Sequence, residues 1–239
     1  MTLIYRYPPL LEGTLVSRYK RFFADIQLTT GELITAHCPN TGPMTGVCQI
    51  GNRVMVSKSD SKTRKLAYTW ELIELQDNDR PVWCGVNTGL PNKVTKAAIE
   101  QRVISELSDY ETLRSEVPYG QENSRVDLLL ESPDAKPTYV EVKNTTWTHG
   151  THALFPDTVT TRGQKHIREM ISLMPDARAV MLYFINRGDC DRFSPGDAKD
   201  PKYGKLLREA IQQGLEVLPC RFEVMPEGIA YLGLAELVL

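Results

Sequence analysis

The sequence lacks the features that mark membrane-spanning, secreted and disulfide-stapled proteins. No run of apolar residues approaches the ~18 that a membrane-spanning helix requires. The first residues, MTLIYRYPPLLEG, contain no basic segment followed by an apolar one, so no secretory signal is visible. Only five cysteines occur, none of them in a CxxC motif, which disfavours a disulfide scaffold and a zinc ribbon. We therefore expect a cytoplasmic protein without a membrane partner.

Excess charge of either sign is also nearly absent. The 239 residues include 28 basic and 30 acidic ones, which gives a formal net charge of −2. This balance excludes an overall basic surface for nucleic acid but leaves room for a local basic patch. Hydrophobic residues make up 41% of the chain, enough for a substantial core. At ~150 residues per domain, the length corresponds to one large domain or two small ones.

The first 80 residues have the pattern of an all-β domain. Runs rich in β-branched and aromatic residues alternate with turn-forming residues. The clearest hairpin joins residues 22–28 to residues 33–37 through a turn that contains Gly31. Further strands are expected at residues 46–50, 53–56 and 66–75. This number of short strands favours a small OB-like β-barrel over a sandwich, and we predict that barrel at residues 1–80.

Residues 81–239 alternate between helical and strand patterns, after a polar linker expected at residues 77–92. Residues 179–185 (AVMLYFI) are apolar without alternation, as in a strand that is buried on both faces. The sequence therefore predicts an α/β domain with a mixed sheet flanked by helices. Its predicted elements are helices at 95–107, 162–174 and 202–213 and strands at 113–117, 125–130, 138–143, 179–185 and 215–224.

Two of these predicted strands place acids and a base close together. Asp127 lies inside the apolar run of residues 125–130, and Glu141 and Lys143 alternate with two valines. Side chains alternate faces along a strand and rise ~3.3 Å per residue, so Glu141 and Lys143 share a face roughly 6–7 Å apart. If the two strands pair, Asp127 lies beside Glu141. The alternative is an acid–lysine pair on an exposed sheet face.

This grouping suits chemistry on phosphodiesters. Two carboxylates with open water positions form a hard-oxygen site for Mg²⁺ or Mn²⁺, which can activate a bound water. Lys143 can then orient or deprotonate that water. We expect Glu100 as a third metal ligand, because it lies within or at the edge of the apolar stripe that includes Ala97 and Ile104. The alternative is that Glu100 pairs with a nearby lysine or arginine.

Basic residues form two groups that suit phosphate binding. At the helix expected from residue 162, backbone amides and basic side chains favour an anion, and Gln164 faces inward. The N-terminal group interleaves charge with aromatic residues, which can stack on bases. In each case the alternative is an ordinary solvated surface. The predicted nucleic-acid-binding residues are Arg162, Lys165, His166 and Arg168 in the helix and Arg18, Lys20, Arg21, Lys58, Lys62, Arg64 and Lys65 in the barrel.

Asp127 and the stretch 141–143 (EVK) resemble the PD-(D/E)XK nuclease motif, although Val126 stands where that motif has proline. The whole chain is similar to the sugar fermentation stimulation protein family through the stretches HCPNTG (37–42), SRVD (124–127), YVEVK (139–143), ALFPD (153–157), RGQKH (162–166) and PEGI (226–229). The resemblance implies an OB-like domain, a restriction-endonuclease-like domain, DNA binding and a regulatory role in sugar (maltose) utilisation. In similar nucleases a Gln or Lys at the position of Gln164 helps to shape the phosphate site.

Together these observations predict a DNA-binding protein, without sequence preference, that regulates sugar utilisation and carries a metal-competent, nuclease-like site. The predicted catalytic residues are Asp127, Glu141, Lys143 and Gln164, and the predicted ligands of Mg²⁺ or Mn²⁺ are Glu100, Asp127 and Glu141. One alternative is an active Mg²⁺- or Mn²⁺-dependent nuclease that acts on DNA or RNA. Another is a non-catalytic regulator that binds a small molecule or a protein on the same scaffold.

Overall fold

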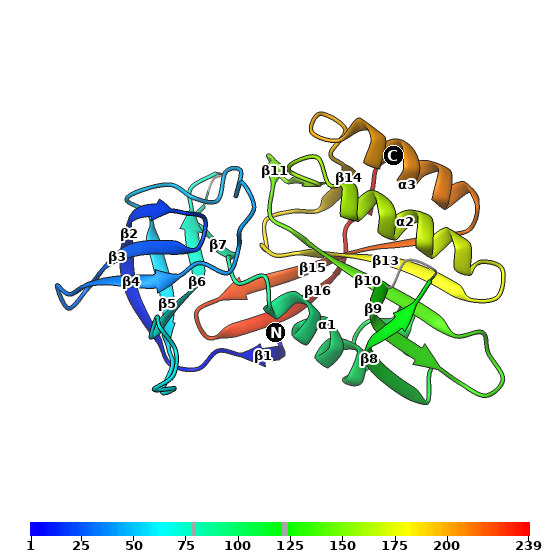
Figure 1. Cartoon of the computed structure of the whole chain (residues 1–239), viewed down its shortest axis with the longest axis horizontal. Helices are drawn as coiled ribbons and strands as arrows, with labels where there is room; N and C mark the ends of the chain where they lie inside the picture. Colours follow the sequence, from blue (N-terminus) through cyan, green and yellow to red (C-terminus); the bar gives the residue numbers. More distant parts are fainter. Residues whose placement is uncertain (78–79, 121–123) are drawn as a thin grey trace.

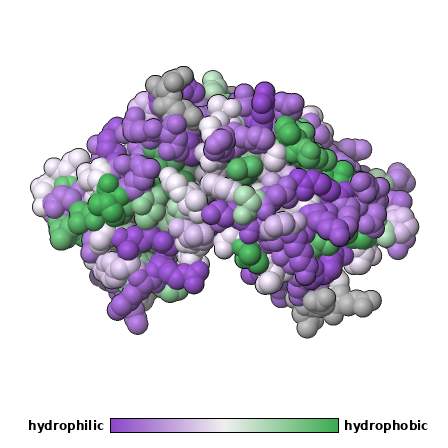
Figure 2. Space-filling model, turned by 90° about the horizontal axis from the view of Figure 1, so that it is seen from above, coloured by the Kyte–Doolittle hydropathy of each residue, from purple (hydrophilic) through white to green (hydrophobic). Residues whose placement is uncertain are grey.

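The structure is a computed structural model, and it describes residues 1–77, 80–120 and 124–239. Figure 1 shows two units side by side: a barrel built from the first third of the chain, and a larger sheet flanked by helices built from the rest. Figure 2, seen from above, shows two lobes with a largely hydrophilic surface and a notch between them. Among the described residues, no helix is long and apolar enough to cross a membrane.

The N-terminal unit is a closed five-stranded barrel of the OB type, as predicted. Its strands are β2 (Leu10–Tyr19), β3 (Phe23–Leu28), β4 (Leu33–His37), β5 (Arg53–Lys58) and β6 (Tyr68–Leu75), with β7 (Val82–Gly85) added at the edge. β4 and β6 pair in parallel and close the barrel. The other neighbouring strands pair antiparallel. Inward-facing residues such as Ile26, Val54 and Ile73 fill the core.

The barrel covers residues 10–85 rather than the predicted 1–80. β1 (Leu3–Arg6) pairs instead with β16 (Gly228–Leu234) of the C-terminal sheet, and β7 extends the barrel past residue 80. The strand expected at residues 46–50 is a loop that contains turns. Val47 in this loop is 1% exposed and packs into the barrel core. The apolar run at 46–50 therefore reflects core packing by a loop rather than a strand.

The C-terminal unit is a seven-stranded mixed sheet flanked by helices, which confirms the predicted fold class. Its strand order is β1-β16-β15-β13-β10-β9-β8. The three central strands run parallel and the outer neighbours pair antiparallel. The remaining bounds are β8 (Thr112–Tyr119), β9 (Ser124–Glu131), β10 (Thr138–Thr145), β13 (Arg178–Ile185) and β15 (Glu216–Met225). A smaller sheet contains β11 (Thr148–His149), β12 (His152–Phe155), β14 (Arg192–Pro195) and β17 (Glu236–Leu237).

Helices cover both faces of this sheet (Figure 1). α1 (Leu90–Glu100) packs on one face, where Val94 and Leu182 share a core. α2 (Thr161–Leu173) and α3 (Pro201–Gln212) pack on the other face, where Ile167 and Met181 share a second core. Because successive residues of β13 enter the two cores in turn, this strand is buried on both sides, as its unbroken apolar sequence predicted.

α1 begins at Leu90 rather than at residue 95, and it ends at Glu100 rather than at residue 107. Pro91 lies in the first turn, where its missing N–H removes no helical hydrogen bond. Ile104 and Leu107 are buried, but Ile104 has an extended backbone and Leu107 belongs to a separate 3₁₀ turn (Ser105–Leu107). The apolar spacing that predicted one long helix therefore comes from two different elements.

Backbone and ionic contacts join the two units directly. The Gly85 N–H of β7 donates to the Asn186 carbonyl at 3.0 Å. The buried Arg187 guanidinium contacts Asp77, just after β6, at 2.9 Å, and Asp189 in its own loop at 2.7 Å. These contacts hold the barrel against the segment that follows β13.

Candidate functional site

Asp127 lies where β9 and β10 stop pairing as neighbours. The last paired positions are Leu128 and Val140. Asp127 directly precedes Leu128 in β9. Its side chain takes the place of a strand partner, because its Oδ2 accepts a hydrogen bond from the Val142 N–H at 2.7 Å. Its Oδ1 accepts a second hydrogen bond, from the Asn92 amide of α1, at 2.6 Å. The carboxylate of Asp127 is therefore held by a strand and a helix at once.

Glu141 and Lys143 share one face of β10, as strand alternation predicted. Glu141 Oε1 accepts a hydrogen bond from Lys143 Nζ at 2.5 Å and contacts Nδ1 of His166 on α2. Lys143 Nζ lies 3.1 Å from the same ring nitrogen. Glu141 is 2% exposed, and its second oxygen, Oε2, has no hydrogen-bond partner among the described residues. A buried carboxylate oxygen without a partner is unfavourable, so Oε2 is available to a cation.

The two carboxylates titrate differently because their neighbours differ. Burial, and then the negative charge of Glu141, raise the pKa of Asp127 from 3.8 to about 6. Burial also opposes ionisation of Glu141, but Lys143 and His166 outweigh burial and lower the pKa of Glu141. Glu141 is therefore anionic at neutral pH, whereas Asp127 takes up a proton near pH 6. A divalent cation would favour the anionic form of both groups.

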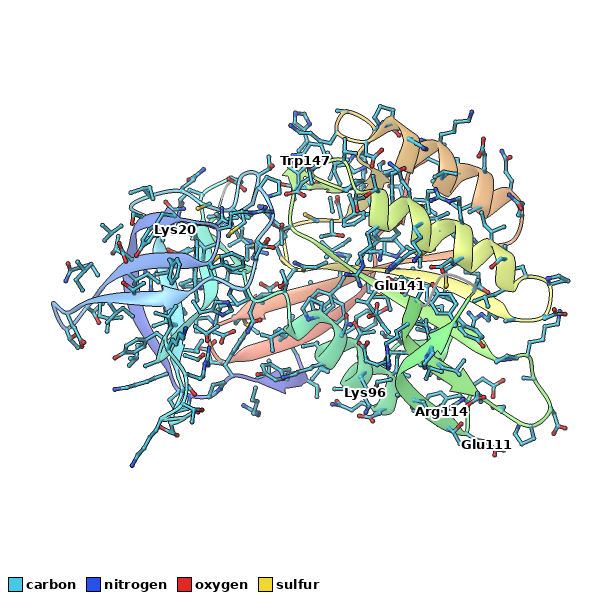
Figure 3. The ribbon with its side chains drawn as sticks, viewed as in Figure 1. Lys20, Lys96, Glu111, Arg114, Glu141 and Trp147 are labelled. Carbon is cyan, nitrogen blue, oxygen red and sulfur yellow. The ribbon has the colours of Figure 1, made fainter. Side chains whose placement is uncertain are left out.

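A cavity of about 480 Å³ is lined by both carboxylates, by Asn92 of α1 and by residues of α2. Three cationic side chains, those of Arg125, Arg162 and Lys165, line it as well. Figure 3 shows Glu141 within the sheet, below α2. The cavity therefore combines oxygen ligands for a cation with positive side chains for a phosphate.

Glu100 lies outside this cavity, at the exposed end of α1. Its carboxylate is 3.8 Å from the Lys96 ammonium, and its side chain is 54% exposed. The prediction of Glu100 as a third metal ligand is therefore wrong, because the helix that was expected to turn it inward ends at this residue. α1 contributes Asn92 to the site instead.

Gln164 faces inward as predicted, but it does not reach the carboxylates. It is 5% exposed, and its amide nitrogen donates to both carboxylate oxygens of Asp200, at 3.0 and 2.9 Å. Asp200 in turn caps α3 by accepting a hydrogen bond from the Tyr203 N–H at 3.0 Å. The contacts of Gln164 therefore join α2 to α3, and they correct its predicted place in the phosphate site.

The other predicted residues of α2 divide into two groups. Arg162, Lys165 and His166 line the cavity, whereas Arg168 is exposed. His166 is more central than predicted, because it contacts Glu141 inside the sheet–helix interface. It precedes the inward-facing Met170 by one helical turn, and this spacing is the sequence signal that marks it as buried.

Four further lining residues, Asn92, Glu116, Ser124 and Arg125, were not among the predicted site residues. Asn92 fell in the expected linker, because the helix was placed from residue 95. Glu116 has a left-handed backbone in the middle of β8, with a φ of 55°, and its carbonyl accepts a hydrogen bond from Arg125 Nη1 at 3.0 Å. This irregularity turns Glu116 toward the cavity, and no local pattern in the sequence signals it.

The basic residues predicted in the barrel lie in two separate places rather than on one face. Figure 3 shows Lys20 near the upper end of the barrel, and Figure 1 shows the β5–β6 connection extending from its lower end. Arg18 donates to the Asn40 and Gly42 carbonyls at 2.9 and 3.0 Å, and Arg21 donates to the Thr41 carbonyl at 2.6 Å. These two arginines hold the adjoining loop. The exposed residues of the β5–β6 group are Lys58, Lys62, Arg64 and Lys65.

Comparison with known proteins covers both units. Residues 16–86 match the family described as the SfsA N-terminal OB domain, and residues 89–228 match the sugar fermentation stimulation protein RE domain. The sugar fermentation stimulation protein homolog of Cyanothece is 66% identical, over 99% of this chain and 98% of its own length. The homolog of Synechocystis is 60% identical, over 100% of both chains. The structure of Pyrococcus furiosus SfsA in complex with Ca²⁺ is similar over 100% of both chains, with a TM-score of 0.88 and 25% sequence identity.

Proposed function

Since the chain belongs to the sugar fermentation stimulation protein family, we propose that it binds DNA and holds a divalent cation at Asp127 and Glu141. The observation that carries this proposal is the buried Oε2 of Glu141, which has no partner among the described residues and lies in a cavity with two further acidic residues, Asp127 and Glu116, and three basic side chains. Such charges contact phosphates rather than base edges, so binding is independent of sequence. The role in sugar (maltose) utilisation is then exerted through DNA, in the cytoplasm.

The residues present fit a hard cation such as Mg²⁺, Mn²⁺ or Ca²⁺. Carboxylate oxygens are the ligands that these ions prefer, and the raised pKa of Asp127 reflects its burial beside another carboxylate. Within the described ranges no three His, Cys, Asp or Glu side chains gather closely enough to hold a metal ion, so water and a phosphate oxygen would complete the set. The similarity to Pyrococcus furiosus SfsA, which was solved with Ca²⁺, supports this assignment.

Fluorescence anisotropy with a labelled DNA oligonucleotide tests the proposal. We expect tighter binding in Ca²⁺ than in EDTA, because the cation joins a phosphate to the carboxylates. Glu141→Gln should lose this gain and keep its affinity in EDTA. Glu100→Gln is the matched control and should behave like the wild type, since Glu100 lies outside the cavity. Wild-type affinity that is equal with and without Ca²⁺, or a full gain in Glu141→Gln, contradicts the proposal.

Hydrolysis of a phosphodiester is a second candidate function, and the position of Lys143 favours it. The Lys143 side chain is 12% exposed, and its ammonium lies within hydrogen-bond distance of both Glu141 and His166. From there the ammonium can orient a water molecule or balance charge on a phosphate, whereas deprotonation of the water would require the neutral amine. A divalent cation, when bound, supplies an activated water and neutralises developing negative charge.

Substitution of Lys143 separates binding from chemistry. Lys143→Ala should keep the cation, because an ammonium is not a metal ligand, and should lower kcat for Mn²⁺-dependent cleavage by ~10²-fold or more. Lys143→Arg should rescue little, because a guanidinium is neither compact nor titratable. Cleavage is measured on single- and double-stranded DNA and RNA with Mg²⁺, Mn²⁺ and EDTA. If no substrate is cleaved, hydrolysis is excluded and DNA binding remains. Full-rate cleavage by Lys143→Ala excludes the role of Lys143.

A further inference from the structure

Three adjoining cavities connect the carboxylate site to the barrel. The cavity of about 480 Å³ shares Asn92, Glu116 and Asp127 with a second one of about 320 Å³. The second cavity shares Thr88 and Lys93, among others, with a third one of about 500 Å³. We call this continuous depression the interdomain groove. It leads from the sheet, past the start of α1, to the barrel.

Positive side chains follow the groove from one unit to the other. Lys93 and Lys96 of α1 line the second cavity, and Arg64 of the barrel lines the third. Lys93 is exposed, and within the described ranges Lys96 makes a solvent-exposed ion pair with Glu100 at 3.8 Å, which is weak enough to exchange for a phosphate. Figure 3 shows Lys96 at the lower end of α1, below Glu141 in this view.

The acid that lines the third cavity is Glu71, and its oxygens are directed to protein partners. Glu71 is 6% exposed, and both of its carboxylate oxygens are engaged. One accepts a hydrogen bond from the Ser57 hydroxyl at 2.6 Å, and the other accepts one from the Asn87 amide at 2.7 Å. Tyr5 also lines this cavity and presents an aromatic surface of the kind on which bases stack. Cationic and aromatic side chains therefore occur together at the barrel end.

We propose that the interdomain groove binds a single strand of nucleic acid, whose phosphates contact Arg64, Lys93 and Lys96 on the way to the carboxylate site. This inference rests on the proposed function and names its substrate class. A duplex has a persistence length of ~50 nm and cannot follow a series of small recesses, whereas a single strand can. Arg64 belongs to the β5–β6 connection, so the groove also leads toward the exposed Lys62 and Lys65.

Anisotropy titrations in EDTA test this path without cleavage. The probes are a labelled single-stranded DNA, a single-stranded RNA of the same sequence, and the matching DNA duplex. Lys93→Ala/Lys96→Ala should weaken single-strand binding by 10-fold or more, and the slope of log affinity against log salt should fall by roughly 0.7 for each lost phosphate contact. Arg64→Ala should act in the same direction. The DNA and RNA arms show which single strand the groove prefers.

Lys205→Ala is the matched control for the lysine variants. Lys205 on α3 makes the same i,i+4 pair, with Glu209 at 3.8 Å, on the other side of the sheet, and its loss should leave binding unchanged. Unchanged single-strand affinity in Lys93→Ala/Lys96→Ala overturns the proposal that the interdomain groove binds a single strand. Tighter wild-type binding of the duplex than of the single strand also overturns it. If single-strand binding is lost only in Arg162→Ala/Lys165→Ala, the path is wrong but the proposed function stands. A wild-type protein that binds none of the probes overturns both.

Discussion

Two buried ionic clusters in this molecule differ in how completely their charges are paired. In the first, the Arg187 cluster, Arg187 is 1% exposed and contacts Asp77 and Asp189. Its guanidinium donates two hydrogen bonds to Asp189, both at 2.7 Å, and one to Asp77 at 2.9 Å. Burial opposes the positive charge, but the acids outweigh burial and raise the pKa of Arg187. This cluster satisfies its guanidinium and joins the barrel to the sheet.

The second cluster, the Glu141 cluster, comprises Asp127, Glu141, Lys143 and His166, and it is incompletely paired. One Glu141 oxygen has no partner among the described residues, and the pKa of Asp127 is raised to about 6. Three of its members, Asp127, Glu141 and His166, line a cavity of about 480 Å³. Burial of charge therefore does not by itself indicate function. Burial indicates function when the charge is also uncompensated and lines an accessible cavity.

The largest expected effect on stability comes from removing the cation of the Arg187 cluster. Arg187→Met keeps a long side chain but leaves Asp77 and Asp189 without their cation, so we expect a loss of about 3–5 kcal/mol in the free energy of unfolding. Urea denaturation followed by circular dichroism measures it. Cation binding at Glu141 should survive in the folded variant. A loss below ~1 kcal/mol, the range of exposed pairs, would place this cluster among ordinary surface contacts.

Neutralising a carboxylate in the Glu141 cluster should change the free energy of unfolding in the opposite direction. Asp127→Asn removes a negative charge that burial and Glu141 disfavour, so in EDTA at pH 7 the variant should be more stable by about 1–3 kcal/mol. Asn92 can rotate its amide to present an oxygen to the new side chain. Thermal unfolding measures the difference, and a less stable variant at pH 7 contradicts the account.

The pH dependence of that stability difference follows from the raised pKa of Asp127. Below the ordinary value of 3.8, Asp127 is protonated in both the folded and the unfolded wild type. As pH rises through 3.8 toward about 6, the folded protein holds its proton longer than the unfolded one, and the wild type loses stability relative to Asp127→Asn. The advantage of the variant should therefore grow over this interval and level off above it. A constant difference across the interval would assign it to packing.

Cation affinity should change with pH by a smaller amount. Because Asp127 must lose its proton before it binds a cation, affinity for Mn²⁺ should fall by ~10-fold per pH unit below the pKa of about 6. Above that pKa it should change little. Calorimetric titrations at pH 5, 6, 7 and 8 measure the slope. Affinity that is constant from pH 5 to 7 would show that Asp127 is not a ligand.

The smallest effect is expected for an exposed counterpart of the Arg187 cluster. Arg208 and Asp197 form a close pair at 2.5 Å, but their side chains are 35% and 46% exposed. Arg208→Met should therefore cost at most ~1 kcal/mol in unfolding free energy. The same urea denaturation measures it. A cost equal to that of Arg187→Met would show that burial does not separate the two pairs.

Local patterns predicted those features that depend on neighbours in the chain. The period of two placed Glu141 and Lys143 on one face of β10, and the unbroken apolar run predicted a central strand at β13. Glu100 was misplaced because Ile104 and Leu107 matched a helical period while belonging to segments outside α1. Periodicity identifies a buried face only within one continuous element.

Contacts between distant residues could not be predicted from local patterns. The inward position of Gln164 follows from helical spacing, but its partner Asp200 is the N-cap residue of a different helix, α3. Arg18 is a residue type that commonly contacts nucleic acid, yet its guanidinium donates hydrogen bonds to loop carbonyls. Asn92 reaches Asp127 only because α1 starts earlier than its apolar spacing indicated. In each case the polar group is satisfied by tertiary structure.

The central claim is that Asp127 and Glu141 bind a divalent cation, and calorimetric titration with Mn²⁺ at pH 7.5 tests it most directly. The account predicts binding of one ion by the wild type and by Glu100→Gln, whose carboxylate lies outside the cavity. It predicts that Asp127→Asn and Glu141→Gln, each confirmed as folded by circular dichroism, lose that binding. Wild-type protein that binds no ion, or binding that persists unchanged in both cavity variants, would contradict it.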